Sequence, residues 1–328
     1  MIYQRRTLEK EILKASKRFK AVMVSGMRRV GKSTMLKFLC AENRTCVSLD
    51  DLLASELAAD ARGEFFRRYP APVLVDEMQR VPELCLEVKE LADSSDERGR
   101  VWLCGSQRFS MMQNIPDSLA GRLACFELLP VSLYERQDKA FEQKPYLPPG
   151  NLDRGALTPQ TLEETWRIIW QGSWPEVIRA TPKKRNLFFQ GLLQAHIDRD
   201  VVRSGIRNLP GYQKFLTILA SRIGRELQLN AVAAEAGVAV QTVKQWLSVA
   251  ESSGIIYLLP PFSENVGKTV IKRPKLFFTD TGFAAWLCNV PSAEALRNAY
   301  NSGSFFENLR LRGYMWVKNS PLSPQILG

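Results

Sequence analysis

The sequence predicts an α/β fold, in which a parallel sheet with flanking helices forms the first half and a mainly helical region follows. Three observations support this prediction. Short apolar runs that end in small or acidic residues alternate with helix-like segments between residues 21 and 107. Proline and glycine concentrate near residues 145–158, which indicates a domain boundary. Beyond this boundary, apolar residues recur at helical spacing.

The composition limits the class of protein. With 328 residues, 45% of them apolar and 24% charged, the chain is typical of a soluble globular protein with two or three domains. The first residues mix charged and apolar groups and do not resemble a signal peptide. No run approaches the ~18 apolar residues of a membrane span. We therefore expect a cytoplasmic protein with no membrane partner.

The positive charge is concentrated in the second half of the chain. The net charge is +11; residues 151–328 hold 21 Lys and Arg against 13 Asp and Glu, whereas residues 1–150 hold 24 against 21. Such an excess is typical of a protein with a nucleic-acid partner, and a solvated basic face is the alternative.

The segment VMVSGMRRVGKSTMLKFL, residues 22–39, has the pattern of a strand, a glycine-containing turn and a helix. Its spacing fits G-x-x-x-x-G-K-[ST], in which backbone N–H groups and the helix N-terminus face phosphates. Lys32 is then expected to reach the β- and γ-phosphates, and Ser33 to bind Mg²⁺. The predicted ATP-binding residues are Gly26, Met27, Arg28, Arg29, Val30, Gly31, Lys32, Ser33 and Thr34.

A second apolar strand, in TCVSLDD at residues 45–51, ends in two aspartates, and a third, in APVLVDEMQ at residues 71–79, ends in Asp76 and Glu77. Downstream of a phosphate loop, this pair predicts that Asp76 binds Mg²⁺ through water and that Glu77 polarises the attacking water. A helix N-cap is the alternative. The guanine-reading N-K-x-D pattern is absent, which favours ATP over GTP.

A further strand at residues 100–107 is expected to lie in the sheet between the two motif-bearing strands. Ser106 or Gln107, at its end, would then sense the γ-phosphate. An ordinary turn at the end of a strand is the alternative. This arrangement is the fold of a P-loop NTPase domain.

The order of motifs resembles a known family. GMRRVGKSTML, VSLDD, VLVDEMQRVPEL, LCGSQRFSMM, SLAGRLACFELLPVSLYE, GSWPEVI, HIDRDV, KLFFTDTG and GSFFENL occur in sequence. This set is similar to the bacterial and archaeal AAA-type ATPases called AAA domain fourteen, which are fused to a winged-helix and nuclease-like region. The resemblance covers residues 1 to about 312.

The resemblance implies roles for individual residues. Gly105 and Ser106 match the family's sensor turn, and Arg122 matches an arginine that acts as a finger or sensor in catalysis. A structural ion pair is the alternative for Arg122. Similar proteins continue into a PD-(D/E)xK segment, of which this sequence has Glu307 but no E-V-D or E-x-K afterwards. We therefore expect no nuclease activity, and loose packing from about residue 300.

Residues 211–262 carry a helix-turn-helix pattern. One helix closes at Gly224, a second runs from a cap at Asn230 to Gly237, and the third buries apolar residues at helical spacing. The remaining polar face predicts DNA contacts by Gln241, Thr242, Lys244, Gln245 and Ser248. The following segment has the pattern of a hairpin wing with nearby basic residues. Protein contact is the alternative role for this module.

Other reactive groups have local structural interpretations. The only histidine, His196, is expected to be packed or exposed on a helix, because no second ligand is spaced to help it bind a metal. The cysteines form no C-x-x-C pair and are expected to be mostly buried and reduced, and a metal or redox site is the alternative. The basic residues 183–185 are expected in a solvated loop, and phosphate contact is the alternative.

The expected organisation is an ATPase domain at residues 1–150, a helical linker at 151–210, a winged helix at 211–274 and an incomplete nuclease-like segment at 275–328. The expected function is Mg²⁺-dependent ATP binding and hydrolysis that controls binding to double-stranded DNA or a partner protein, with a homo-oligomer as a further expectation. The alternative is a regulatory nucleotide switch with negligible turnover, in protein–protein signalling or a toxin–antitoxin-like role.

Overall fold

The chain divides into two compact units. The computed structural model describes residues 3–40, 42–105, 121–142, 157–261 and 273–318. The first unit includes the residues up to Leu129 and Leu133–Leu157, and the second includes Pro130–Ser132 and Thr158–Met315. The short stretch Pro130–Ser132 therefore belongs to the second unit although both its flanks belong to the first.

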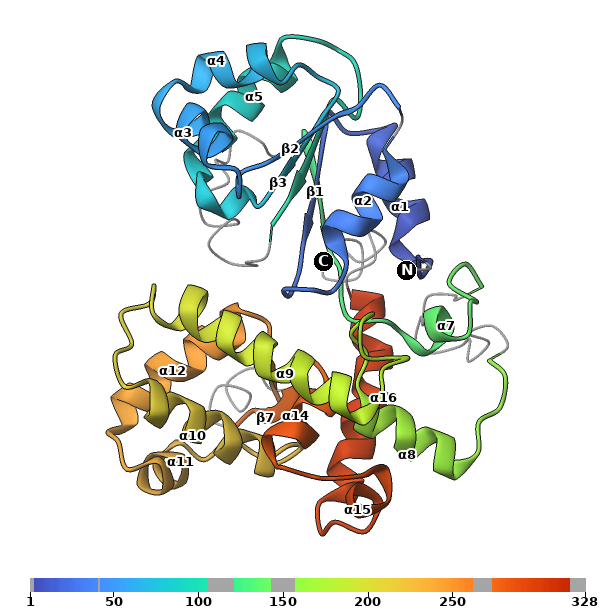
Figure 1. Cartoon of the computed structure of the whole chain (residues 1–328), viewed down its shortest axis with the longest axis vertical. Helices are drawn as coiled ribbons and strands as arrows, with labels where there is room; N and C mark the ends of the chain where they lie inside the picture. Colours follow the sequence, from blue (N-terminus) through green and yellow to red (C-terminus); the bar gives the residue numbers. More distant parts are fainter. Residues whose placement is uncertain (1–2, 41, 106–120, 143–156, 262–272, 319–328) are drawn as a thin grey trace. The chain divides into compact units, whose positions relative to one another are not determined.

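A parallel sheet forms the centre of the first unit (Figure 1). Its order is β2-β3-β4-β1-β5, and each neighbouring pair is parallel. The prediction that the strand at residues 100–107 lies between the two motif-bearing strands is confirmed, because β4 pairs with both β1 and β3. The last strand, β5, was not predicted. The strands are β1 (Ala21–Ser25), β2 (Thr45–Ser48), β3 (Val73–Asp76), β4 (Val101–Cys104) and β5 (Leu123–Glu127).

Helices cover both faces of this sheet, because alternate residues of each strand point to opposite sides. Met23, Val75 and Leu103 pack in one cluster with residues of α3, α4 and α5. Trp102 points to the other face, where its indole N–H donates to Ser16 Oγ at 2.9 Å. Figure 1 shows the two helical layers. The elements are α1 (Leu8–Ser16), α2 (Lys32–Leu39), α3 (Leu52–Asp60), α4 (Arg62–Arg68), α5 (Cys85–Asp93) and α7 (Leu133–Arg136), with the 3₁₀ turns η1 (Met78–Arg80) and η2 (Pro82–Leu84).

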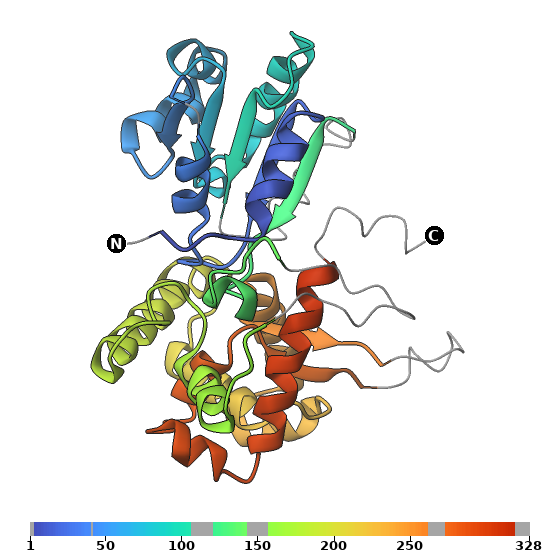
Figure 2. The same cartoon turned by 90° about the vertical axis from the view of Figure 1, so that its right-hand side faces the viewer.

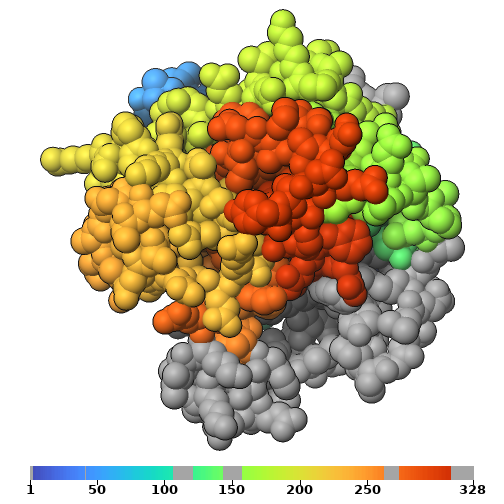
Figure 3. Space-filling model, turned by 90° about the horizontal axis from the view of Figure 1, so that it is seen from below, coloured from blue at the N-terminus to red at the C-terminus, as the bar shows by residue number. Residues whose placement is uncertain are grey.

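The second unit is helical apart from one antiparallel pair of strands, β6 and β7. Figure 2 shows this pair beside the last helix, and Figure 3 shows that the surface formed by the segment of residues 209–252 adjoins the surface of the segment after residue 281. The elements are α8 (Leu162–Gln171), α9 (Pro182–His196), the π-helix η4 (Ile197–Val201), α10 (Leu209–Ser221), α11 (Leu229–Ala236), α12 (Val240–Ser252), β6 (Ile256–Leu259), β7 (Lys275–Phe278), α14 (Thr281–Leu287), α15 (Ala293–Arg297) and α16 (Ser302–Lys318).

Two sequence motifs, GSWPE and DTG, meet in the core of this unit. The Ser173 N–H donates to Asp280 Oδ2 at 2.7 Å. A Cβ on Gly282 would lie 2.4 Å from the Gly172 backbone, so only glycine fits this crossing. The contact joins the segment after α8 to the start of α14. The expected 151–210, 211–274 and 275–328 regions therefore contribute helices to one compact unit.

Three local predictions were wrong. The second helix of the helix-turn-helix pattern is capped by Gln228, and Asn230 lies inside it. The basic residues 183–185 begin α9 instead of forming a loop, and Arg185 is buried, where it donates to the carbonyl oxygens of Trp170 and Gly282. Only two of the cysteines, Cys85 and Cys104, are buried.

The start of α16 is well packed, contrary to the expected loose packing from residue 300. Phe305 is completely buried. The Asn308 amide donates to the Phe278 carbonyl and accepts from the Phe278 N–H, both at 2.8 Å. The helix thus supplies hydrogen-bond partners for the backbone N–H and C=O groups of Phe278 in β7, and this contact holds the start of α16 against the strand. Among the described residues, no helix is long and apolar enough to cross a membrane.

Candidate nucleotide site

The turn between β1 and α2 requires glycine at two positions for different reasons. Gly26 has φ +146°, and a Cβ there would lie 2.3 Å from the Leu128 carbonyl oxygen. Gly31 adopts the left-handed conformation, φ 95°, at the N-cap of α2. The two motif glycines therefore shape a loop that leads directly into a helix N-terminus, where an anion is favoured. Within the loop, Met27 and Val30 are buried, Arg28, Gly31 and Ser33 half-buried, and Arg29 and Thr34 exposed.

Lys32 lies folded back within this loop. Its side chain is buried, and Nζ donates to the carbonyl oxygens of Gly26 at 2.9 Å and Met27 at 2.7 Å. Burial lowers the pKa of Lys32 below its ordinary value, and the nearby acidic groups of Cys104, Glu77 and Asp76 oppose this shift. The amine thus sits where the loop begins, held by backbone acceptors that a phosphate could replace.

Asp76 ends β3 at the same edge of the sheet. Its carboxylate is buried, and Oδ1 accepts from the Glu77 N–H at 3.0 Å. Since β4 separates β3 from β1, the last residue of β4, Cys104, lies between the two motifs. Its Sγ is 3.9 Å from Ser33 Oγ. Burial, reinforced by the Asp76 charge, raises the pKa of Cys104 well above its ordinary value.

Glu77 follows Asp76 in a left-handed conformation with φ 57°. A non-glycine residue in this region is uncommon and carries a conformational cost. The Gln79 amide donates to Glu77 Oε2. Next to this pair, Arg80 forms an ion pair with Asp50 at 2.5 Å, which ties η1 to the end of β2. The Glu77 carboxylate is thus held by a neighbouring amide at the edge of the site.

The oxygen atoms of Ser33 and Asp76 suit a magnesium ion. Mg²⁺ prefers oxygen ligands and usually takes only one or two from the protein, the others from phosphates and water. Within the described ranges, no three His, Cys, Asp or Glu side chains gather closely enough to hold a metal by themselves. The donor set therefore fits an ion that arrives with a nucleotide.

Comparison with known families agrees with this geometry. Residues 18–137 match a family model described as "AAA domain", and residues 162–294 match one described as "Domain of unknown function (DUF8612)". Residues 18–137 thus belong to an AAA-type ATPase domain. The sheet order places it among P-loop NTPase folds.

Relatives cover the length of the chain at low identity. "Uncharacterized protein Mb2031c" of Mycobacterium bovis and "Uncharacterized protein Rv2008c" of Mycobacterium tuberculosis are each 22% identical over 316 residues. These matches cover 95% of this chain and 66% of each relative, so the chain spans about two thirds of their length. A solved Walker-type ATPase of Pyrococcus abyssi has a TM-score of 0.52 at 15% identity, covering 87% of this chain and 96% of its own. That likeness concerns the fold alone.

Two further predicted site residues of the AAA domain, Ser106 and Gln107, lie outside the described residues. Gly105, just before them, donates its N–H to the Val24 carbonyl at 3.1 Å. The turn after β4 therefore starts at the same edge as the phosphate loop.

Arg122 lies at the opposite edge of the AAA domain. Leu123 pairs with Ala21, at the amino end of β1, whereas the phosphate loop follows Ser25 at its carboxyl end. Four residue steps of about 3.3 Å separate the two ends. Arg122 Nε lies 2.6 Å from Asp93 Oδ1 in a half-exposed ion pair. The structure thus does not bring Arg122 to the phosphate loop of its own chain.

Outside the AAA domain, α12 presents most of the predicted polar face. Gln241, Lys244, Gln245 and Ser248 are exposed, and Thr242 is half-buried. The opposite face is buried, with Val243 and Trp246 inside the core. A hollow of about 370 Å³ lies beside this helix. Its lining residues are Gly205, Ile206, Arg207, Asn208, Val238, Ala239, Thr242, Gln245 and Trp246.

The remaining candidates have structural partners. His196 is buried between Asp200 and Tyr212, with both ring nitrogens 3.0 Å from an oxygen. The prediction of a packed helix histidine is confirmed. Glu307 forms an ion pair with Lys275 at 2.8 Å.

Sequence reasoning missed two residues near the site. Cys104 carried a signal, since it ends an apolar strand predicted to be the neighbour of both motifs. Arg6 carried none, because it stands in a charged segment before the first helix. It donates to the carbonyl of Val30 in the phosphate loop.

Proposed function

We propose that this protein binds ATP with Mg²⁺ and hydrolyses it at the loop of residues 26–34. The observation that carries this proposal is the proximity of Lys32 and Ser33, which follow β1, to Asp76 and Glu77, at the end of β3, on the same carboxyl edge of the sheet. Ligands of parallel α/β sheets bind at this edge.

Each residue has a stated role in the proposal. Lys32 would exchange its two carbonyl partners for the β- and γ-phosphates. Ser33 and Asp76 would hold the ion, Asp76 through a water molecule. When bound, Mg²⁺ supplies positive charge that stabilises the phosphates as they react. Glu77 would polarise the attacking water once its carboxylate leaves the Gln79 amide, and Ser106 or Gln107 would sense the γ-phosphate.

We propose a catalytic role for Arg122 only at the nucleotide site of a neighbouring subunit. Its place at the far edge of the sheet argues against a role at its own chain's phosphate loop. A homo-oligomer in which Arg122 reaches a neighbouring site remains part of the proposal.

We further propose that α10–α12 with β6 and β7 form a winged helix that binds double-stranded DNA. The exposed Gln241, Lys244, Gln245 and Ser248, with half-buried Thr242, would contact bases and phosphates. The basic excess of the second half supports this assignment. Nuclease chemistry is not part of the proposal, because among the described residues Glu307 lies in no cluster of three acidic, histidine or cysteine side chains.

A regulatory switch with negligible turnover is the second candidate. The bond from Gln79 to Glu77 favours it, because a carboxylate held by an amide is a poorer water-activating group. In this version, the α12 face binds a partner protein, and the nucleotide controls that contact.

Hydrolysis measurements with and without duplex DNA separate the two candidates. The proposed ATPase should turn over ATP with Mg²⁺, and duplex DNA should change the rate. Tight ATP binding without measurable phosphate release would favour the switch. The absence of ATP binding would refute both.

A further inference from the structure

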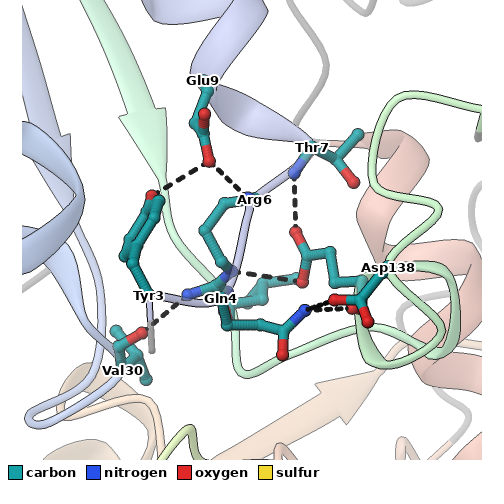
Figure 4. A network of polar contacts seen from close by, with 9 residues as sticks. Tyr3, Gln4, Arg6, Thr7, Glu9, Val30 and Asp138 are labelled. Atoms are coloured by element: carbon teal, nitrogen blue, oxygen red, sulfur yellow. Dashed lines mark hydrogen bonds and ion pairs between the residues drawn. The ribbon is translucent and has the colours of Figure 1, made fainter. Parts of the chain in front are cut away.

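Arg6 is a buried arginine whose guanidinium joins three separate parts of the first unit. Only 2% of the residue is exposed. Nη1 donates to the Val30 carbonyl at 2.7 Å, and Nη2 donates to the Leu129 carbonyl. Nε lies 3.2 Å from Glu135 Oε2. Figure 4 shows this network at the start of the chain.

The network itself is tightly held. Glu135 is completely buried, and its Oε1 accepts the Thr7 N–H at 2.8 Å. The Arg6 N–H donates to Glu9 Oε1 at 2.6 Å, and the Tyr3 hydroxyl donates to the same oxygen at 3.0 Å. A buried ion pair of this kind depends on further hydrogen bonds, which Arg6 makes through Nη1 and Nη2, whereas its Nε has only the ion-pair contact with Glu135.

The first partner, Val30, belongs to the phosphate loop. The peptide between Val30 and Gly31 is planar and trans, so the Gly31 N–H points opposite to the Val30 carbonyl. The bond from Arg6 therefore sets the direction of one of the N–H donors on which a phosphate loop depends.

The other two partners flank the segment Pro130–Ser132, which belongs to the second unit. Leu129 precedes this segment and Glu135 lies three residues beyond its end. Within the second unit, the Val131 N–H donates to the Ser173 carbonyl at 2.8 Å, and the Ser173 N–H donates to Asp280. The Arg6 side chain thus contacts the phosphate loop at Val30 and also contacts Leu129 and Glu135, which lie on either side of the segment assigned to the second unit.

We propose that Arg6 is a positioning residue that couples the phosphate loop to residues 129–135, and through them to the second unit. Nucleotide binding moves the loop against the Val30 carbonyl, and the guanidinium passes this shift to Leu129 and Glu135. The inference rests on the proposed nucleotide site. Lysine cannot replace arginine here, because a single ammonium lacks the planar fork that serves separate acceptors.

Hydrogen–deuterium exchange tests the coupling without requiring hydrolysis or DNA binding. In the full-length protein, a slowly hydrolysed ATP analogue with Mg²⁺ should change exchange in peptides that cover residues 128–136. We expect about fivefold or more, the lower range of typical site coupling. In Arg6→Lys this response should disappear while the analogue still binds. The Arg6→Lys ATPase should also show a kcat lower by about tenfold or more with little change in KM.

Two other variants complete the test. Arg5→Lys is the matched control, because Arg5 pairs with Glu9 at 3.2 Å from an exposed position and should leave the response intact. Glu135→Gln retains an acceptor for the Thr7 N–H and should weaken the response, which keeps the proposal testable if Arg6→Lys unfolds.

The outcomes are distinct. An unchanged response in both Arg6→Lys and Glu135→Gln overturns the inference. A wild-type protein that binds the analogue without any response at residues 128–136 also overturns it, and leaves the proposed function standing. A protein that binds no nucleotide removes both.

Discussion

Lys32 Nζ lies 2.7 Å from the carbonyl oxygen of Met27, within the loop that the lysine itself follows. The amine is thus hydrogen-bonded to backbone carbonyl oxygens of its own loop. Replacing it by alanine removes the charge that would meet the β- and γ-phosphates, while the loop's N–H groups remain.

Lys32→Ala should therefore lower ATP affinity by at least about tenfold, equivalent to about 1.4 kcal/mol. Titration calorimetry measures the change. Lys37→Ala, at an exposed position of the same helix, is the control and should bind ATP normally. Equal affinities in wild type and Lys32→Ala would contradict the assigned role.

Glu77→Gln should retain ATP binding and lose hydrolysis. The substitution leaves Asp76 in place and removes only the carboxylate that would polarise water. A general base typically contributes about 10²–10⁴ in rate. Phosphate release at saturating ATP, with binding measured in parallel, checks this expectation. Hydrolysis at the wild-type rate would remove Glu77 from the mechanism.

A role of Arg122 across a subunit interface predicts an ATPase rate per chain that rises with protein concentration. Arg122→Ala should abolish this rise, since arginine fingers contribute about 10³–10⁵ in rate. Asp93→Ala is the matched control, because it breaks the same ion pair and leaves the arginine. A rate per chain that stays flat with concentration would leave Arg122 with its structural contact alone.

If α12 binds duplex DNA, affinity should fall steeply with salt. Lys244→Ala should reduce the slope of log affinity against log salt by about 1, the share of one phosphate contact. Fluorescence anisotropy on mixed duplexes provides the measurement. Lys214→Ala, exposed on α10, is the control. No binding at about 50 mM salt would support protein contact for this face.

The packing of α16 predicts a stability difference between two adjacent phenylalanines. Phe305 is completely buried, whereas 38% of Phe306 is exposed. Phe305→Ala should lower the free energy of unfolding by about 3–5 kcal/mol. Phe306→Ala should cost about 1 kcal/mol. Urea unfolding followed by tryptophan fluorescence compares them, and equal midpoints would mean that α16 does not stabilise the second unit in solution.

The sequence by itself determined the sheet apart from its edge strand β5, and the motif residues at its carboxyl edge. Glycine spacing and the acidic residues after an apolar run are local signals. Parallel strands place their carboxyl ends together, so the approach of the loop at Lys32 to Asp76 follows from those signals. The exposed polar face of α12 follows likewise from helical periodicity, although Thr242 is half-buried.

Only the tertiary structure decided which charged residues are buried. Arg6 and Glu135 are 129 positions apart, and each stands among polar neighbours typical of a surface. Arg185 likewise belongs to a basic cluster that the sequence predicts to be exposed, whereas its side chain is buried in the structure. A buried charge is tolerated only where distant carbonyls and carboxylates converge on it, and no local pattern records that convergence. The same reason applies to Asn308, whose amide completes the edge of β7 from a helix 30 residues away.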